Sequence, residues 1–292
     1  MSQLQAMRTH DITATIGTRV EGIDVTDGIS GDVADALYGL LLTRGVLVLP
    51  NQALTPQGHV ALAESFGPVG LPHPLYPRVP GHDQINIIRN DENHPPENEV
   101  WHSDLSCRVH PPFVSVLRAH TIPPVGGDTL WADMRAVHDS LSPVLREMLG
   151  RLSAEHTLEQ GFAFLTEFGH ADRQESLSRT DPADNRAVHP VIVRHPADGR
   201  PIVYVNESFT TRIPGMAPTE SRAILGILFD AVRNPRFQMR HRWAPDTVVI
   251  WDNWATQHFA CGDHYPAFRE VQRVTVSSNA RSGEFGTTGV AS

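Results

Sequence analysis

The chain has 292 residues, is 40% hydrophobic and carries a formal net charge of −9, so it can bury a sizeable core. No linker-like stretch or repeat interrupts it, and we expect one domain over residues 1–292. The negative charge argues against nucleic acid as a partner but does not exclude a small anion in a locally basic pocket. No signal-peptide core or membrane-spanning run is present, and two cysteines are too few for a disulfide framework. These features predict a cytoplasmic protein without a membrane partner.

The first third of the chain predicts alternating helices and strands with a polar loop at its end. Apolar spacing predicts a helix over Asp32–Leu42, and a short apolar run predicts a strand over Val46–Leu49. A second helix is expected over Pro56–Phe66, with proline at its first position. β-Branched residues predict a strand over Asp83–Arg89. Asp91–Glu99 is polar and contains two prolines, which predicts a loop.

The remainder of the chain is richer in strand patterns. Helical spacing over roughly Met134–Gly169 predicts a helical insertion, and Pro218–Val232 predicts an amphipathic helix. Turn residues between Val191–Arg194 and Ile202–Val205 predict a hairpin. Five more strands are expected: Phe113–Ala119, Thr129–Trp131, Phe237–Trp243, Thr247–Trp251 and Glu270–Ser277. Many short strands with surrounding helices favour a mainly β fold with a jelly-roll barrel as its core.

Candidate metal ligands follow directly after the predicted loop. His102 and Asp104, which we place at the start of a strand, are two residues apart, so both side chains would point to the same face. A third ligand must come from far along the chain, and His258 is the best candidate among 16 histidines. Two histidines and one carboxylate form the facial iron(II) triad, which leaves positions open for substrate and oxygen. Surface polar residues and a structural histidine would give the same pattern, and this alternative stays open.

Candidate anion-binding residues lie near the end of the chain. Arg269 and Arg273 share one strand face with Val271 and Thr275. If that face points inward, two arginines enter the core about 13 Å apart, and each buried guanidinium needs an anion. An exposed edge strand with salt bridges is the alternative. Thr129, after a Gly-Gly turn, offers a hydroxyl to such an anion, although an ordinary strand threonine has the same pattern.

Taken together, the motifs resemble those of the iron(II)/2-oxoglutarate-dependent dioxygenases of the taurine dioxygenase family. The agreement covers nearly the whole chain and keeps the family's order. The motifs that carry it are Gly22–Asp24, Trp101–Asp104, Gly126–Trp131, Val205–Glu207, Phe209–Ile213, Trp251–Asn253, Gln257–His258, Arg269 and Arg273. The resemblance implies a double-stranded β-helix core with helices around it.

The resemblance also implies roles for individual residues. His102, Asp104 and His258 fall on the iron-ligand positions of the family. Thr129 and Arg269 match the positions that bind the distal carboxylate of 2-oxoglutarate. The positions around the substrate, including the arginine that holds the sulfonate of taurine, are matched by His73, Tyr76, Asn98, Phe162, Phe209 and Arg273.

The implied reaction requires iron(II), 2-oxoglutarate and oxygen. The carbon next to the sulfonate of taurine or a related alkylsulfonate is hydroxylated, and sulfite, an aldehyde, succinate and CO2 are released. Two departures bear on the substrate, because Cys107 replaces the family's usual phenylalanine and Gly161 its serine. Both remove volume beside the substrate, so a larger sulfonate, or a sulfate ester of the kind that alkylsulfatases take, stays open.

Two other classes of function fit the same residues. A zinc hydrolase could use the three ligands with a bound water, but Arg269 and Thr129 would then lack a role. A non-catalytic protein could bind an anion on the same barrel. The loop Asp91–Glu99, which contains Asn98, either closes over the substrate or is a static surface loop. A homo-oligomer is left open by the sequence.

Overall fold

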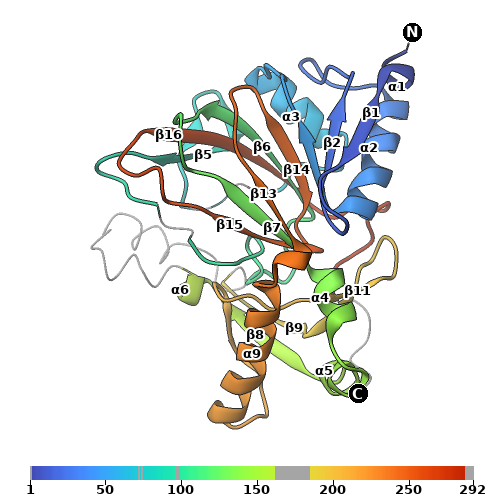
Figure 1. The fold of residues 1–292 in the computed structure, drawn as a ribbon, viewed down its shortest axis with the longest axis vertical. Helices are drawn as coiled ribbons and strands as arrows, with labels where there is room; N and C mark the ends of the chain where they lie inside the picture. Colours follow the sequence, from blue (N-terminus) through green and yellow to red (C-terminus); the bar gives the residue numbers. More distant parts are fainter. Residues whose placement is uncertain (1, 72, 74, 97–98, 162–184, 287–292) are drawn as a thin grey trace.

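The computed structural model describes residues 2–71, 73, 75–96, 99–161 and 185–286, and most of its regular structure is antiparallel sheet (Figure 1). The largest sheet has eight strands in the order β1-β2-β3-β14-β6-β16-β5-β4. All its pairs are antiparallel except β2 with β3. The strands are β1 (Arg8–Asp11), β2 (Thr18–Glu21), β3 (Val46–Leu49), β4 (Arg78–Val79), β5 (His82–Asn90), β6 (Val114–Thr121), β14 (Val248–Asp252) and β16 (Arg269–Val276).

Three smaller sheets complete the β structure, in the orders β13-β7-β15, β12-β8-β9 and β10-β11. Their strands are β7 (Thr129–Asp133), β8 (Ser153–Thr157), β9 (Arg186–Pro190), β10 (Ile192–Arg194), β11 (Pro201–Val203), β12 (Thr210–Arg212), β13 (Gln238–His241) and β15 (Thr256–Ala260). Apolar side chains of the large sheet, such as Val48, Leu117 and Val271, meet Trp131 of β7 and Met239 of β13 in one buried cluster. The large sheet and the β13-β7-β15 sheet therefore face each other across a shared core.

Of the helices in the described ranges, some pack on the outer side of the large sheet and others lie with the smaller sheets. They are α1 (Gln3–Ala6), α2 (Gly31–Arg44), α3 (Pro56–Glu64), α4 (Met134–Ser140), α5 (Pro143–Leu149), α6 (Leu158–Gly161) and α9 (Pro218–Val232), with a 3-10 turn at Pro235–Phe237. Helix α2 packs on β3 and β14, and α3 packs on β5, β6 and β16. Both faces of β16 are buried as a result, one under α3 and one toward the facing sheet. Among the described residues, none of the helices has the length and hydropathy needed to span a bilayer.

Most elements predicted from the sequence are confirmed. The strand Val46–Leu49 and the helix Pro218–Val232 have the predicted bounds, and the hairpin is the β10-β11 pair. The jelly-roll architecture is confirmed as well, although the sheets of the described residues do not close into a barrel. The order of strands in the large sheet, with sequence-distant strands as neighbours, could not be predicted from local patterns.

The predicted helical insertion over Met134–Gly169 is wrong in part. Helices α4 and α5 occur there, but Ser153–Thr157 is the strand β8, which lies between β9 and β12. This segment has the sequence SAEHT, with few strand-favouring residues, and it is extended because strands from later in the chain pair with both its edges. Residues 162–169 lie outside the described residues. In Figure 1, β8 and β9 lie with α5 and α9 below the two facing sheets.

Helix α9 offers a direct test of how its apolar face contributes to stability. Leu228 is fully buried, whereas its neighbour Ile227 is 49% exposed on the same helix. We expect Leu228→Ala to lower the free energy of unfolding by about 2–5 kcal/mol, because it leaves a cavity in the core. Ile227→Ala should change it by less than about 0.5 kcal/mol. Urea unfolding followed by circular dichroism measures both, and equal losses would contradict the packing of this helix.

Candidate active site

Three candidate ligands converge in a buried cavity between the two facing sheets. The ligand atoms of His102, Asp104 and His258 all lie within 4.8 Å of one another. The two imidazole rings have centroids 4.0 Å apart, and His258 Nε2 is 4.0 Å from Asp104 Oδ1. No other group of histidine, cysteine, aspartate or glutamate side chains in the described ranges has a comparable arrangement. Two histidines and a carboxylate form the triad that leaves one side of an iron(II) ion open.

The strand predicted to start at His102 is wrong. His102 makes one isolated bridge to His258 of β15, with main-chain hydrogen bonds of 3.0 and 2.8 Å. The chain then turns from Asp104, and Leu105 has a positive φ of 50°. The main chain of Asp104 bonds to a side chain instead of a strand. Its N–H donates to Asn253 Oδ1 at 2.8 Å, and its carbonyl accepts from Asn253 Nδ2 at 3.0 Å.

The protonation states of the ligands suit a divalent metal. Burial lowers the pKa of His102 and that of His258, which favours neutral imidazoles. His102 Nδ1 donates to the carbonyl of Val100 at 2.8 Å, so its Nε2 lone pair faces the cavity. Burial would raise the pKa of Asp104, but Arg273 holds it well below its usual range. Neutral imidazoles and an ionised carboxylate are the forms that coordinate a metal, so these residues fit an iron(II) ion.

An unpaired arginine lies on the same cavity. Arg269 is buried, and burial lowers its pKa to about 10. Its Nε atom has no hydrogen-bond partner in the described part of the chain, and Asp128 interacts with it only at longer range. Gly127 leaves room for it, because a Cβ there would lie 2.9 Å from Arg269 Cδ. Thr129 lines the same cavity as Arg269. This pair can receive one end of an anionic ligand.

A second arginine lies closer to the triad. Arg273 Nη1 donates to Asp104 Oδ1 at 2.5 Å, and its Nε and Nη2 atoms have no partner among the described residues. Its guanidinium carbon is 5.9 Å from the centroid of the Tyr76 ring, and that ring is 4.5 Å from His73. Burial lowers the pKa of His73 well below its usual value. Phe209 forms part of the apolar wall of the same cavity.

The cavity thus brings together most of the residues singled out in the sequence. Those that line it are His73, Tyr76, His102, Asp104, Thr129, Phe209, His258, Arg269 and Arg273. Asn98 and Phe162 lie outside the described residues, so their predicted substrate contacts stay predictions, and both alternatives for the loop Asp91–Glu99, closing or static, stay open. Cys107 is fully buried and packs behind the lining, in a cluster with Leu75, Leu105, Leu158 and Phe209.

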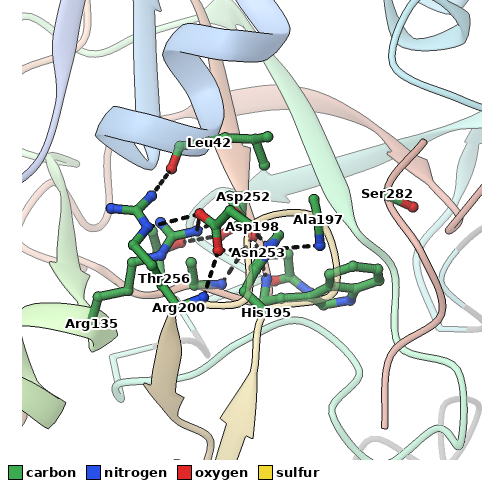
Figure 2. A network of polar contacts seen from close by, with 12 residues as sticks. Leu42, Arg135, His195, Ala197, Asp198, Arg200, Asp252, Asn253, Thr256 and Ser282 are labelled. Carbon is green, nitrogen blue, oxygen red and sulfur yellow. Dashed lines mark hydrogen bonds and ion pairs between the residues drawn. The ribbon is translucent and has the colours of Figure 1, made fainter. Parts of the chain in front are cut away.

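A buried ionic network supports the segment that carries Asn253 (Figure 2). Asp252 Oδ1 accepts from the main-chain N–H groups of Trp254 and Ala255, at 3.1 and 3.0 Å. Its Oδ2 lies 3.0 Å from His195 Nε2 and 3.4 Å from Arg135 Nη2. These contacts fix the turn that presents Asn253 to Asp104. Sequence reasoning missed this support, although the Trp-Asp-Asn motif at the end of a predicted strand pointed to it.

Comparison with known proteins agrees with this geometry. The family described as "Taurine catabolism dioxygenase TauD, TfdA family" matches residues 8–275. An alkylsulfatase of Acinetobacter baylyi is 28% identical over 98% of this chain and 89% of its own length. Pentalenolactone F synthase of Streptomyces arenae is 33% identical over 90% and 92%. The crystal structure of a taurine dioxygenase from Burkholderia xenovorans aligns with a TM-score of 0.80 and 28% identity, covering 98% of this chain and 96% of that one.

Fold, triad and relatives together define a 2-oxoglutarate-dependent dioxygenase. Within that class, the chain belongs to the taurine catabolism dioxygenase TauD, TfdA family. Enzymes of this family use iron(II), 2-oxoglutarate and oxygen. Family membership selects the oxygenase over the zinc hydrolase and the non-catalytic binding protein that the sequence left open.

The ionic network can be tested through Asp252 and its dependence on pH. Burial would raise the pKa of Asp252, but His195 and Arg135 lower it overall. A carboxyl group whose pKa is lower in the folded state stabilises the fold at pH values above its pKa in the unfolded chain. This stabilisation is lost as the pH falls through its pKa in the folded state. We expect Asp252→Asn to cost about 3–5 kcal/mol at neutral pH, because it removes the buried carboxylate that faces both His195 and Arg135 and leaves Arg135 with Asp198 alone. The difference in the free energy of unfolding between this variant and wild type should become smaller below about pH 4.

A matched control for this change is Asp230→Asn. Asp230 pairs with Arg233 on the surface, where its side chain is 82% exposed. Such pairs contribute about 0–1 kcal/mol, so this variant should unfold almost as wild type. Urea unfolding at several pH values measures both variants. A pH-independent loss in Asp252→Asn would show that the charge of Asp252 is not what stabilises the turn.

Gly127 and Gly199 form a second matched pair. Both have φ of +73°, but a Cβ at Gly199 would meet nothing within 4 Å. Alanine should cost each site about 1–2 kcal/mol of backbone strain. Only Gly127→Ala should displace Arg269. We therefore expect the dissociation constant of the Gly127→Ala variant for 2-oxoglutarate to rise at least about tenfold. Anaerobic calorimetry measures that constant, and equal affinities in the two variants would contradict the role of Gly127.

Proposed function

We propose that this dioxygenase oxidises the carbon next to the anionic head of an alkylsulfonate, taurine included, or of an alkyl sulfate ester. The observation that carries the proposal is the position of Arg273. Its guanidinium is buried beside the triad, and two of its nitrogen atoms have no partner within the described part of the chain. A buried guanidinium with free donors favours an anion with several acceptor oxygens. Sulfonate and sulfate groups have this chemistry.

In this proposal, His102, Asp104 and His258 hold iron(II). When bound there, the metal supplies oxygen activation, coupled to the conversion of 2-oxoglutarate to succinate and CO2. The neutral state of both imidazoles and the ionised state of Asp104 support this assignment. The bond from His102 Nδ1 to Val100 keeps one ligand ring in a fixed orientation.

We assign the distal carboxylate of 2-oxoglutarate to Arg269 and Thr129. Arg269 lacks a carboxylate partner of its own in the described ranges, and Thr129 presents a hydroxyl to the same cavity. Arg269 and Arg273 lie four residues apart on β16, which separates them by about 13 Å. One strand can thus hold two different anions apart, so that co-substrate and substrate do not compete for one arginine.

Arg273 and His73 would bind the anionic head of the substrate. Because Arg273 also donates to Asp104, its planar guanidinium group would connect the substrate head to a proposed metal ligand. His73 is held by its main-chain N–H, which donates to Asn86 Oδ1 at 2.7 Å. Fixing the head in this way places the adjacent C–H bond close to the triad, which is the positioning that the reaction requires.

The apolar wall favours a substrate with an aliphatic chain. Leu105 and Phe209 line the cavity, and they pack on Leu75, Cys107 and Leu158. Asp104 is the one carboxylate among the described lining residues, and it is occupied by Arg273. The described lining therefore offers no free carboxylate to the ammonium of taurine, whereas an alkyl chain meets complementary surface.

The expected products follow from the chemistry of the hydroxylated carbon. Hydroxylation next to a sulfonate gives an adduct that expels sulfite and leaves an aldehyde. The same step next to the ester oxygen of an alkyl sulfate expels sulfate and also leaves an aldehyde. In both cases one oxygen atom enters the substrate and the other enters succinate.

The test is a substrate series with iron(II), 2-oxoglutarate and oxygen. Succinate, sulfite and sulfate are measured with taurine, with ethane-, butane- and hexanesulfonate, and with hexyl sulfate. Each buried methylene contributes about 0.8 kcal/mol, so kcat/KM should rise about three- to fourfold per added CH2. Arg273→Ala should lose most of the coupled product release, and Arg151→Ala, on an exposed residue, should not. Succinate without sulfite or sulfate from every substrate would overturn the proposed substrate class.

A further inference from the structure

The hydroxyl of Thr129 is engaged on one side by a tryptophan. Trp243 Nε1 donates to Thr129 Oγ1 at 2.9 Å, and both residues are buried. An indole N–H can only donate, so the hydroxyl oxygen must act as the acceptor in this bond. The hydrogen of the Thr129 hydroxyl must then point elsewhere, and no residue of the described part accepts it.

The direction left open to that hydrogen is the cavity. Thr129 is the first residue of β7, with His241 of β13 opposite it on one side and Ala260 of β15 on the other. Its side chain lines the cavity that also contains Arg269. A threonine side chain in a strand has few allowed rotamers, so the bond to Trp243 leaves little freedom for the hydroxyl.

The bond is specific to this tryptophan within its cluster. Trp131, Trp243 and Trp251 belong to the same buried apolar cluster between the sheets. The indole N–H groups of Trp131 and Trp251 have no hydrogen-bond partner in the described ranges, whereas that of Trp243 is directed at Thr129. Packing alone therefore does not account for the placement of the Trp243 indole nitrogen.

We propose that Trp243 is a positioning residue for 2-oxoglutarate, because its indole N–H fixes the Thr129 hydroxyl as a donor to the distal carboxylate beside Arg269. The inference rests on the proposed role of Thr129 and Arg269. A carboxylate only accepts hydrogen bonds, so a hydroxyl that presents its oxygen would repel it. A hydrogen bond received by the hydroxyl also polarises it and strengthens the bond it donates.

The test compares two ligands that differ only at the distal carboxylate. 2-Oxoglutarate and 2-oxopentanoate are titrated by calorimetry into iron(II)-loaded protein without oxygen. Trp243→Phe should raise the dissociation constant of 2-oxoglutarate about three- to tenfold and leave that of 2-oxopentanoate unchanged. Met239→Leu, a packing change in the same cluster with no hydrogen bond removed, should affect neither ligand.

The outcomes separate this inference from the assignment on which it rests. Thr129→Val should weaken 2-oxoglutarate binding, and adding Trp243→Phe should weaken it no further. If Thr129→Val leaves 2-oxoglutarate binding unchanged, the assignment of the co-substrate site to Thr129 is itself wrong. An effect of Thr129→Val without one of Trp243→Phe, or equal weakening of both ligands by Trp243→Phe, would overturn the positioning role alone.

A measurement on the intact protein covers the case in which Trp243→Phe does not fold. The indole 15N–H resonance of Trp243 can be followed by NMR in wild type. Hydrogen exchange of this indole N–H should slow when 2-oxoglutarate binds, because the Thr129 hydroxyl then both accepts from the indole and donates to the carboxylate. It should not slow with 2-oxopentanoate. Equal protection by the two ligands would overturn the inference.

Discussion

Two hydrogen bonds between the side chain of Asn253 and the main chain of Asp104, one in each direction, are the contacts on which the site depends. Asp104 lies in a turn, so a neighbouring strand does not fix its position. The amide of Asn253 replaces the strand partner, and it also donates to the carbonyl of Pro112, just before β6. The turn that carries Asn253 is held by the buried carboxylate of Asp252, which accepts from the main-chain N–H groups of Trp254 and Ala255. Asp104, a proposed metal ligand, is thereby connected to the end of β14, in the interior of the large sheet.

Burial of charge distinguishes the two arginines of β16, Arg269 and Arg273. Asp104 stays ionised inside the protein because Arg273 is paired with it. Arg269, four residues earlier, has no such partner among the residues that the structure describes, and a buried cation without one is costly. This cost is consistent with the proposed binding of an anion at Arg269. The same strand thus contains one arginine that pairs with Asp104 and one that does not, and the proposed binding sites of substrate and co-substrate lie in that order along it.

Local patterns predicted the elements whose formation depends on their own sequence. The helix Pro218–Val232 has proline at its start and an apolar stripe, and the strand Val46–Leu49 is continuously apolar. The strand Ser153–Thr157 has no such pattern and exists because two other strands pair with it. The site followed the same rule. Residue types at motif spacing predicted the triad and both arginines, but Asn253 and Trp243 act through partners 149 and 114 positions away in the sequence.

The contact between the His102 segment and β15 also closes a very long loop. Ser103 Oγ donates to the carbonyl of Thr256 at 2.8 Å, and the two residues are 153 positions apart. Closing a loop of about 100 residues or more removes entropy worth about 5 kcal/mol from the unfolded chain when the closure is a cross-link. An ion held by both His102 and His258, as proposed, would be topologically such a cross-link, and it would stabilise the folded state by mass action. The proposed metal site would then also link two segments that are far apart in the sequence, those of His102 and His258. His102 and His258 can meet only after the chain has been synthesised as far as residue 258.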